Sequence, residues 1–209
     1  MAERIVTGAA CLAEGAAWLS RRDPRLAPVL AAAAPLPLRR RPPGFATLAE
    51  ILVAQQVSTA AAAAIFGRLA AAGLTEAAAV RRASDGALAG CGLSRAKIGH
   101  LRALAAADLD HARLAGAGEA EVVAALTALP GFGRWSAEIY LLSALGRADA
   151  FPAGDLALRE AARRAFGLAA RPDEGQLRAM AERWRPWRAV AARALWAYYR
   201  VQTGREGTR

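Results

Sequence analysis

The sequence predicts an all-α protein, and three observations support this. Apolar residues recur at helical spacing along most of the 209 residues, and essentially no segment shows the apolar–polar alternation that indicates a strand. Alanine, which has the highest intrinsic helix propensity, supplies much of the hydrophobic share of 55%. The connections between helical segments are short, as in compact helical folds. Because alanine buries little area, the larger apolar side chains must be concentrated where helices meet.

The periodicity predicts helices at 9–19, 24–33, 46–55, 58–72, 76–82, 84–90, 94–108, 119–128, 134–145, 155–166, 173–183 and 187–200. Thr47 followed by Glu50 indicates a capping box at the start of the segment 46–55. Trp18 and Trp196 are expected in the core. Four further residues are placed to cap the helix that follows each of them: Ser58, Ser84, Ser94 and Asp173.

The charge indicates a polyanionic partner. The chain holds 28 Lys and Arg against 18 Asp and Glu, a formal net charge of +10. Codon bias in a GC-rich genome accounts for arginine in place of lysine but less well for the net excess. The only lysine is Lys97. A proline-rich stretch, 35–44, contains three consecutive arginines that either contact phosphate or are simply solvated.

Several classes of protein are excluded by composition. Two cysteines, Cys11 and Cys91, are too few for an iron–sulfur cluster or a structural zinc site. The weak apolar stretch at the N-terminus contains Glu3 and Glu14, which does not fit a signal peptide. The sequence contains no run of about 18 strongly apolar residues, so we expect no membrane span. We therefore expect a cytoplasmic protein with no membrane partner.

The most informative stretch is LPGFGRWSA at 129–137, between two helical segments. Pro130 ends the first helix, and Gly131 and Gly133 allow a tight turn through positive φ. The next helix begins with unpaired N–H groups and the positive end of the helix dipole, which together can bind a phosphate. From the pattern alone, a plain helical hairpin and a phosphate-binding hairpin are both open.

This stretch resembles the helix-hairpin-helix of the base-excision DNA glycosylase superfamily named after that motif and a Gly/Pro-rich loop with an Asp (HhH-GPD). Within it, the chain is most similar to the alkylbase (3-methyladenine) DNA glycosylases II. The resemblance rests on five motifs in the family's order and spacing: ILVAQQVS (51–58), GLSRAK (92–97), LPGFGRWSA (129–137), FPAGD (151–155) and RWRPWR (183–188).

The resemblance implies that Asp155 is the catalytic carboxylate. Without the resemblance, an Asp ahead of a helical segment is a plain N-cap, and the two roles are compatible. Breaking an N-glycosidic bond builds positive charge on the sugar. A fixed carboxylate stabilises that charge and can orient or deprotonate the attacking water. An alkylated base is often cationic and leaves easily, which fits a sequence without an obvious general acid.

The resemblance also implies a base pocket and DNA contacts. A flipped, cationic base would stack on aromatic rings, for which we expect Trp135, Tyr140 and Trp187. Tyr140 lies five residues after Trp135, not the family's usual four, so its ring can point into the core instead. Gln56 matches the residue that fills the gap left by the flipped nucleotide. The expected DNA contacts are Gln55, Gln56, Ser58, Lys97, Gly131, Phe132, Gly133 and Arg134.

Family members often hold a monovalent cation at the hairpin. By position, the ligands here would be the carbonyl oxygens of Thr127, Leu129 and Phe132, with Na⁺ or K⁺ as the ion and no other cofactor. Bifunctional relatives, which also cut the strand, carry a lysine in the hairpin where this chain has Trp135. The resemblance therefore implies a monofunctional enzyme that uses water. The lack of a C-terminal cysteine cluster argues against the iron–sulfur branch.

The expected architecture is the two-lobed helical fold of the family without the extra N-terminal α+β domain. One lobe would span 45–145 and end in the hairpin, and the other would combine 1–44 with 146–209 and carry Asp155. The expected partner is duplex DNA with damaged bases, bound by a monomer in the bacterial cytoplasm at the nucleoid. Three alternatives stay open. The first is a glycosylase for uracil, hypoxanthine or mismatched adenine, and the second is a non-catalytic DNA-binding protein with the same hairpin. The third is an alanine-rich helical interaction protein with an incidental excess of positive charge.

Overall fold

A computed structural model describes residues 4–204 of the chain and divides it into two compact units. Unit 1 combines residues 1–40 with 141–209, and unit 2 spans 41–140. The lobe boundaries expected from the sequence were placed at 44/45 and 145/146. Every regular element in the described range is helical, and the one extended contact there is an isolated antiparallel bridge between Ile5 and Arg147. The all-α prediction is confirmed.

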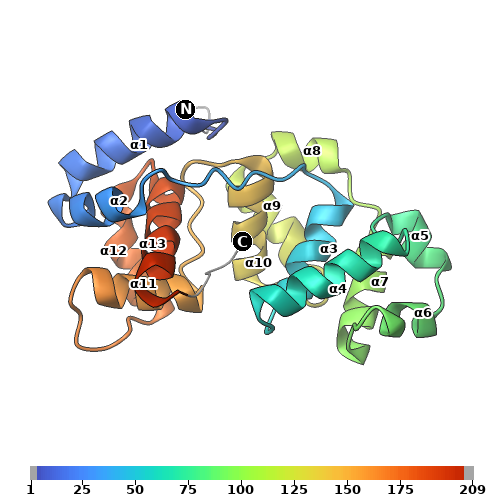
Figure 1. Ribbon diagram of the computed structural model, residues 1–209. Helices are drawn as coiled ribbons and strands as arrows, with labels where there is room; N and C mark the ends of the chain where they lie inside the picture. The colour runs from blue at the N-terminus through green and yellow to red at the C-terminus, as the bar shows by residue number, and fades with distance from the viewer. Residues whose placement is uncertain (1–3, 205–209) are drawn as a thin grey trace. The chain divides into compact units, whose positions relative to one another are not determined.

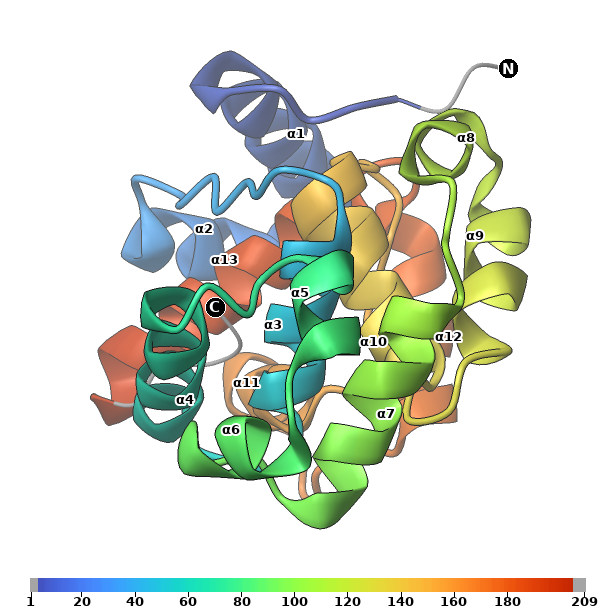
Figure 2. The ribbon, with the colours of Figure 1, turned by 90° about the vertical axis from the view of Figure 1, so that its right-hand side faces the viewer.

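Unit 2 is built around α3 (Phe45–Ala54), which packs against α4, α7 and α10 (Figure 2). Seven residues of α3 are buried, and this apolar helix forms the centre of the unit's core. The remaining elements in chain order are α4 (Thr59–Ala71), α5 (Ala77–Arg82), α6 (Asp85–Gly90), α7 (Arg95–Ala106), α8 (His111–Gly116), α9 (Glu119–Thr127) and α10 (Arg134–Tyr140).

In unit 1, α13 (Arg188–Thr203) packs against α1, α2 and α11 (Figure 1). Ten consecutive residues of α13, from Arg188 to Ala197, are buried, so this helix is covered on all sides over its first turns. The other elements are α1 (Ala9–Arg22), the 3₁₀ turn η1 (Pro24–Leu26), α2 (Ala27–Ala33), the π-helical η2 (Leu141–Leu145), α11 (Leu156–Ala165), α12 (Glu174–Ala181) and the 3₁₀ turn η3 (Glu182–Trp184).

The predicted serine and aspartate caps are confirmed. The side chains of Ser58, Ser84, Ser94 and Asp173 each accept a hydrogen bond from a backbone N–H in the first turn of the helix that follows. The predicted capping box at Thr47 is wrong. Gly44, with φ of +142°, begins α3 earlier, so Thr47 lies inside the helix and donates to the Pro42 carbonyl at 2.7 Å.

Several helical details differ from the prediction: the segments 24–33 and 173–183, each predicted as one helix, both divide into an α-helix and a 3₁₀ turn, and two further differences lie in α8 and at Leu141. The periodicity missed α8, which has six residues and is too short to show a repeat; its cap is Asp110, which accepts from the Arg113 N–H at 2.9 Å. The segment predicted as one helix over 134–145 changes to π-helix at Leu141. The carbonyl of Leu142 in that turn accepts a hydrogen bond from the Arg193 side chain at 3.1 Å.

Arg193 explains how the proline-rich stretch is fixed. Its guanidinium is 1% exposed and donates to the carbonyls of Leu38, Leu142 and Ala189, each at 3.1 Å. Burial lowers the pKa of Arg193 to about 10. The neighbouring Arg40 donates to the Val6 carbonyl at 3.1 Å. The stretch is therefore tied to unit 1 at Leu38, by the buried Arg193, and at Arg40, by its bond to the Val6 carbonyl.

Candidate functional site

The hairpin between α9 and α10 is a tight turn in which Gly131 has positive φ as expected, whereas the same expectation for Gly133 is wrong. Gly131 has φ of +81°, and a Cβ added there would collide with the ring of His100 on α7. The Phe132 N–H donates to the Leu129 carbonyl at 3.1 Å, and the Phe132 side chain is buried. Gly133 is exposed, and its carbonyl accepts from Ala137 as α10 begins. The turn thus presents backbone to solvent at Gly133 while Phe132 anchors it.

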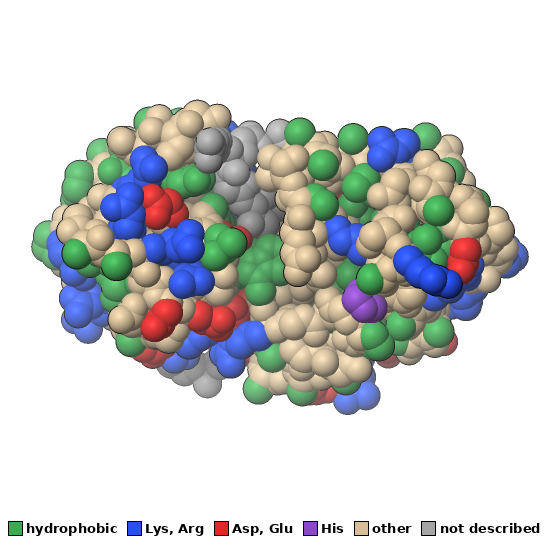
Figure 3. All heavy atoms as spheres, turned by 90° about the horizontal axis from the view of Figure 1, so that it is seen from below, with side chains coloured by type: hydrophobic (Ala, Val, Ile, Leu, Met, Phe, Trp, Pro, Cys, Tyr) green, Lys and Arg blue, Asp and Glu red, His purple; other side chains and the backbone are tan. Residues whose placement is uncertain are grey.

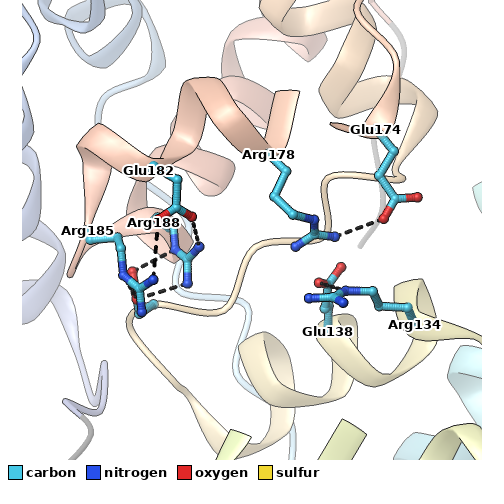
Figure 4. A network of polar contacts seen from close by, with 8 residues as sticks. Arg134, Glu138, Glu174, Arg178, Glu182, Arg185 and Arg188 are labelled. Carbon is cyan, nitrogen blue, oxygen red and sulfur yellow. Dashed lines mark hydrogen bonds and ion pairs between the residues drawn. The ribbon is translucent and has the colours of Figure 1, made fainter. Parts of the chain in front are cut away.

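Arg134 lies at the first residue of α10 and is more than half exposed. Its Nε donates to Oε1 of Glu138, one turn along the helix, at 2.9 Å (Figure 4). Glu138 is 1% exposed, so the pair holds the arginine stem along α10. The other guanidinium N–H groups are the ones that could reach a phosphate, and a DNA contact by Arg134 stays a prediction.

The loop after α3 is linked directly to the hairpin. The Gln55 side-chain amide donates to the Gly131 carbonyl at 2.8 Å and to the Ser136 hydroxyl at 2.9 Å. Gln56 follows at φ of +57°, a left-handed conformation that costs a non-glycine residue about 1–2 kcal/mol. Gln56 is exposed, as are Val57 and Ser58. The exposed tip therefore stands on a base that is fixed against the hairpin.

Lys97 fixes the same loop from α7. Its ammonium donates to the carbonyl of Val53 at 2.7 Å and to that of Gln55 at 2.8 Å, so it caps the C-terminal end of α3. Burial lowers the pKa of Lys97. From the sequence, Lys97 was expected to contact DNA. In the structure, Lys97 holds the end of α3 in position, a role that the sequence did not indicate. A direct contact between Lys97 and a phosphate stays a prediction.

The three aromatic candidates for a base pocket differ in exposure. Trp135, next to the hairpin, is partly exposed. Tyr140 is fully buried, its hydroxyl accepts from the Gly44 N–H at 3.1 Å, and burial raises its pKa. Trp187 is 2% exposed and packs against Gly15 of α1, with the Arg4 guanidinium 4.7 Å from its ring. Of these three rings, the structure offers only that of Trp135 in part to solvent.

The carbonyls predicted to hold a cation lie at the end of α9 and in the turn. Thr127 is the last residue of α9, where the carbonyls of a helix lack partners within the helix. The Leu129 carbonyl already accepts from Phe132, but a carbonyl oxygen has a second lone pair. Backbone carbonyls are suitable ligands for a hard monovalent cation, so this donor set fits the ion chemically.

Asp155 is the N-cap of α11 and is 5% exposed. Its Oδ1 accepts two hydrogen bonds, from the Leu158 N–H at 2.8 Å and from the Trp196 indole N–H at 3.0 Å. The backbone N–H of Asp155 also donates to the Pro152 carbonyl at 2.9 Å, which closes the FPAGD turn. The carboxylate is therefore held in one orientation by the helix that it caps and by α13.

Trp196 is the functional-site residue that sequence reasoning missed. Its burial was expected, but no pattern in the sequence indicates that its indole N–H bonds to a residue 41 positions earlier. Trp18, also expected in the core, is only partly buried. Within residues 4–204 no group of three or more His, Cys, Asp or Glu side chains could hold a metal ion. No helix in the same range is long and apolar enough to cross a membrane.

Comparisons with known proteins agree with these features. Residues 49–186 match the model of the HhH-GPD superfamily base excision DNA repair proteins. The 3-methyladenine DNA glycosylase Mag1 of Schizosaccharomyces pombe, solved in complex with abasic DNA, superposes with a TM-score of 0.82 at 25% identity, covering 90% of this chain and 95% of that one. A DNA-3-methyladenine glycosidase from Bacillus halodurans gives 0.71 at 31% identity, with 89% and 88% covered.

Among curated proteins, a "probable bifunctional transcriptional activator/DNA repair enzyme AlkA" of Mycobacterium tuberculosis is 49% identical over 71 residues, 34% of this chain and 14% of that protein. The matched regions span from 14% to about half of the length of the curated relatives. The family match covers well over half of this chain and includes the α3 loop, the hairpin and Asp155. The chain therefore belongs to the HhH-GPD superfamily of base excision DNA repair proteins.

Proposed function

We propose that this protein is a monofunctional DNA glycosylase that excises alkylated purines, such as 3-methyladenine, from duplex DNA. The observation that carries the proposal is the fixed Asp155 carboxylate at the start of α11, with Oδ1 bound by the Leu158 N–H and the Trp196 indole. The family match and the similarity to solved 3-methyladenine glycosylases support the same proposal.

Excision of an alkylated purine requires a negative charge held near the sugar and a water molecule that can attack C1′. An alkylated purine carries positive charge, so the C1′–N bond breaks with its electron pair passing to the base. The sugar becomes oxocarbenium-like, and the Asp155 carboxylate stabilises it electrostatically. A water oxygen then bonds to C1′, and its proton is taken by the carboxylate or by solvent. The products are the free base and an abasic site.

The hairpin and the α3 loop would hold the DNA. Exposed backbone at Gly133 and the Arg134 side chain are placed to meet a phosphate, and Gln56 stands at an exposed loop tip. In this proposal Gln56 fills the gap left by the flipped nucleotide. A Na⁺ or K⁺ ion bound to the carbonyls of Thr127, Leu129 and Phe132 would add positive charge near the phosphate.

Selectivity for alkylated bases would come from Trp135. A cationic base over an indole gains cation–π energy, about 0.5–2 kcal/mol, that a neutral base does not. The nucleophile would be water and not a lysine amine, because this chain has Trp135 at the hairpin position where the bifunctional members of the superfamily have a lysine. The ammonium of Lys97 is bound to the carbonyls of Val53 and Gln55.

The test is product analysis with methylated duplex DNA. The protein is incubated with the DNA, the released bases are separated by chromatography, and strand breaks are counted before and after alkali. We expect free 3-methyladenine, and breaks only after alkali. Breaks without alkali, together with a borohydride-trapped covalent complex, would contradict the monofunctional mechanism. Release of uracil, hypoxanthine or mismatched adenine from duplexes that carry those bases, with no release from methylated DNA, would contradict the substrate class. DNA binding with no released base would indicate a non-catalytic binding protein.

A further inference from the structure

Most of the positive net charge of the chain belongs to unit 1 and not to the unit that carries the hairpin. Unit 1 holds 19 of the 28 Lys and Arg residues and 10 of the 18 Asp and Glu, a net charge of +9. Unit 2, which carries the hairpin, holds the other nine and eight, a net charge of +1. The hairpin's own unit therefore explains little of the excess, and a surface of unit 1 must account for it.

One hollow of unit 1, about 550 Å³ in volume, gathers part of this charge. We call it the arginine hollow; its lining residues are Trp18, Arg21, Arg22, Glu182, Arg183 and Arg185. Trp18 and the two arginines come from one face of α1, because residues three and four apart on a helix are neighbours. Arg183 comes from η3, which is linked to α1 by a hydrogen bond from Arg22 Nε to the Arg183 carbonyl at 3.3 Å.

The acidic residue of the hollow is already neutralised. Glu182 accepts from Arg188 at 2.8 Å and is paired with Arg185 at 3.4 Å, and both arginines also bind Asp149 (Figure 4). Within residues 4–204, the guanidinium groups of Arg21, Arg22 and Arg183 form no ion pair with a carboxylate. Three uncompensated cations thus share one hollow with a partly exposed indole.

Local helix chemistry explains only part of this arrangement. Basic residues in the last turn of a helix favour its negative end, which accounts for Arg21 and Arg22 on α1. It does not account for Arg183, which belongs to another element. Like charges that lie within a Debye length, about 8–10 Å, repel one another, so their convergence is stabilised when an anion binds.

We propose that the arginine hollow is a second DNA-binding site, separate from the hairpin, that takes the phosphodiester backbone. Planar guanidinium groups match phosphate oxygens in pairs, and an indole can stack on a base or a sugar face. An acidic polypeptide is less suited, because it would need an aromatic or proline side chain at the right position to pack on Trp18, whereas every nucleotide offers a base and a sugar face. The inference rests on DNA being the partner of this family and not on base excision.

The test compares two charge-matched double variants. Arg21→Gln with Arg183→Gln removes two cations from the hollow. Arg171→Gln with Arg200→Gln removes two exposed cations from unit 1 that do not line the hollow. Affinity for undamaged duplex DNA is measured by fluorescence anisotropy between 50 and 200 mM salt, roughly the range over which phosphate contacts dominate. Circular dichroism and thermal melting check that each variant is folded.

The hollow variant should lose about 1–2 from the slope of log affinity against log salt, because each phosphate contact contributes about 0.9. At low salt it should bind roughly tenfold more weakly, and the control should change by much less. Equal slopes for the two variants would overturn the proposal. Unchanged DNA affinity of the hollow variant, with loss of binding to polyglutamate, would overturn it in favour of an acidic protein partner.

A parallel assay of base release from methylated DNA by the parent separates this inference from the proposed enzyme. Different slopes with no base release would leave the hollow as a DNA site and refute the glycosylase. Base release together with equal salt slopes for the two variants would support the glycosylase and refute the arginine hollow as a DNA site.

Discussion

Unit 1 and unit 2 are both helical, yet the features to which the proposals assign DNA binding differ between them. Unit 2 is nearly neutral and relies on backbone geometry: the Gly131 turn, the exposed Gly133 and the loop fixed by Gln55 and Lys97. Unit 1 carries almost all of the net charge and the fixed Asp155. Over unit 1, at the left of Figure 3, Lys and Arg side chains gather in groups with Asp and Glu between them. Net charge alone therefore does not locate the hairpin, to which the proposal assigns DNA binding.

Gly131→Ala is expected to have the largest effect on stability, and it tests whether unit 2 depends on backbone geometry. Alanine would adopt a left-handed φ and collide with His100, at a combined cost of about 2–5 kcal/mol. Urea unfolding measures the loss. Gly133→Ala is the matched control, because its added Cβ meets nothing within 4 Å. An equal loss in both variants would show that the turn is not so constrained.

Trp196→Phe tests whether unit 1 depends on a fixed carboxylate. The variant keeps an aromatic ring, although a smaller one, and removes the indole N–H that binds Asp155 Oδ1, so thermal melting must show that it is folded. A hydrogen bond to a charged group contributes about 1.5–3 kcal/mol, so the rate of base release should fall roughly tenfold to a hundredfold. DNA affinity should be nearly unchanged. A fall in affinity with a normal rate at saturating DNA would contradict the positioning role.

Lys97→Met tests the base of the α3 loop. Methionine fills similar space but cannot donate to the carbonyls of Val53 and Gln55. Loss of this cap should cost about 1–2 kcal/mol, and DNA affinity should fall roughly fivefold to tenfold as the loop loses its fixed position. Lys97→Arg should recover part of the affinity. Equal affinities for the parent and the methionine variant would show that Lys97 does not position the loop.

Acid is expected to weaken unit 1 through Asp23. Hydrogen bonds from Arg25 lower the pKa of this carboxyl from 3.8 to about 2, helped by the Trp184 indole. Because the folded pKa lies below the unfolded one, this contribution to stability is complete above about pH 4 and is lost as the pH falls toward 2. Thermal melting from pH 6 to pH 2 should show this component in the parent and not in Asp23→Asn. The same pH profile in both would contradict the assignment.

Most of the helices could be predicted from the sequence because they depend on neighbouring residues. Most contacts in the candidate site could not, because they join residues that are far apart in the sequence. Ser58, Ser84, Ser94 and Asp173 cap their helices because capping depends on residues within one turn. The role of Asp155 as the cap of α11 followed from the same logic.

The contacts that shape the candidate site join distant positions. Trp196 meets Asp155 from α13, Lys97 reaches the end of α3, and Gln55 reaches the Gly131 carbonyl. No periodicity or spacing encodes these pairs, because each depends on how two helices pack. The π-helical turn at Leu141–Leu145 was missed for the same reason, since the Leu142 carbonyl there is bound by Arg193.

The most direct test of the account is the single-turnover release of 3-methyladenine by Asp155→Asn, with Asp173→Asn as the matched control. Both residues cap a helix in unit 1, and asparagine caps as well as aspartate does. We predict that Asp155→Asn loses at least about a hundredfold in rate while it still binds DNA, because the carboxylate charge is removed and the cap is kept. The Asp173 variant should match the parent. Equal rates for the parent and Asp155→Asn would contradict the central claim that this carboxylate drives base excision.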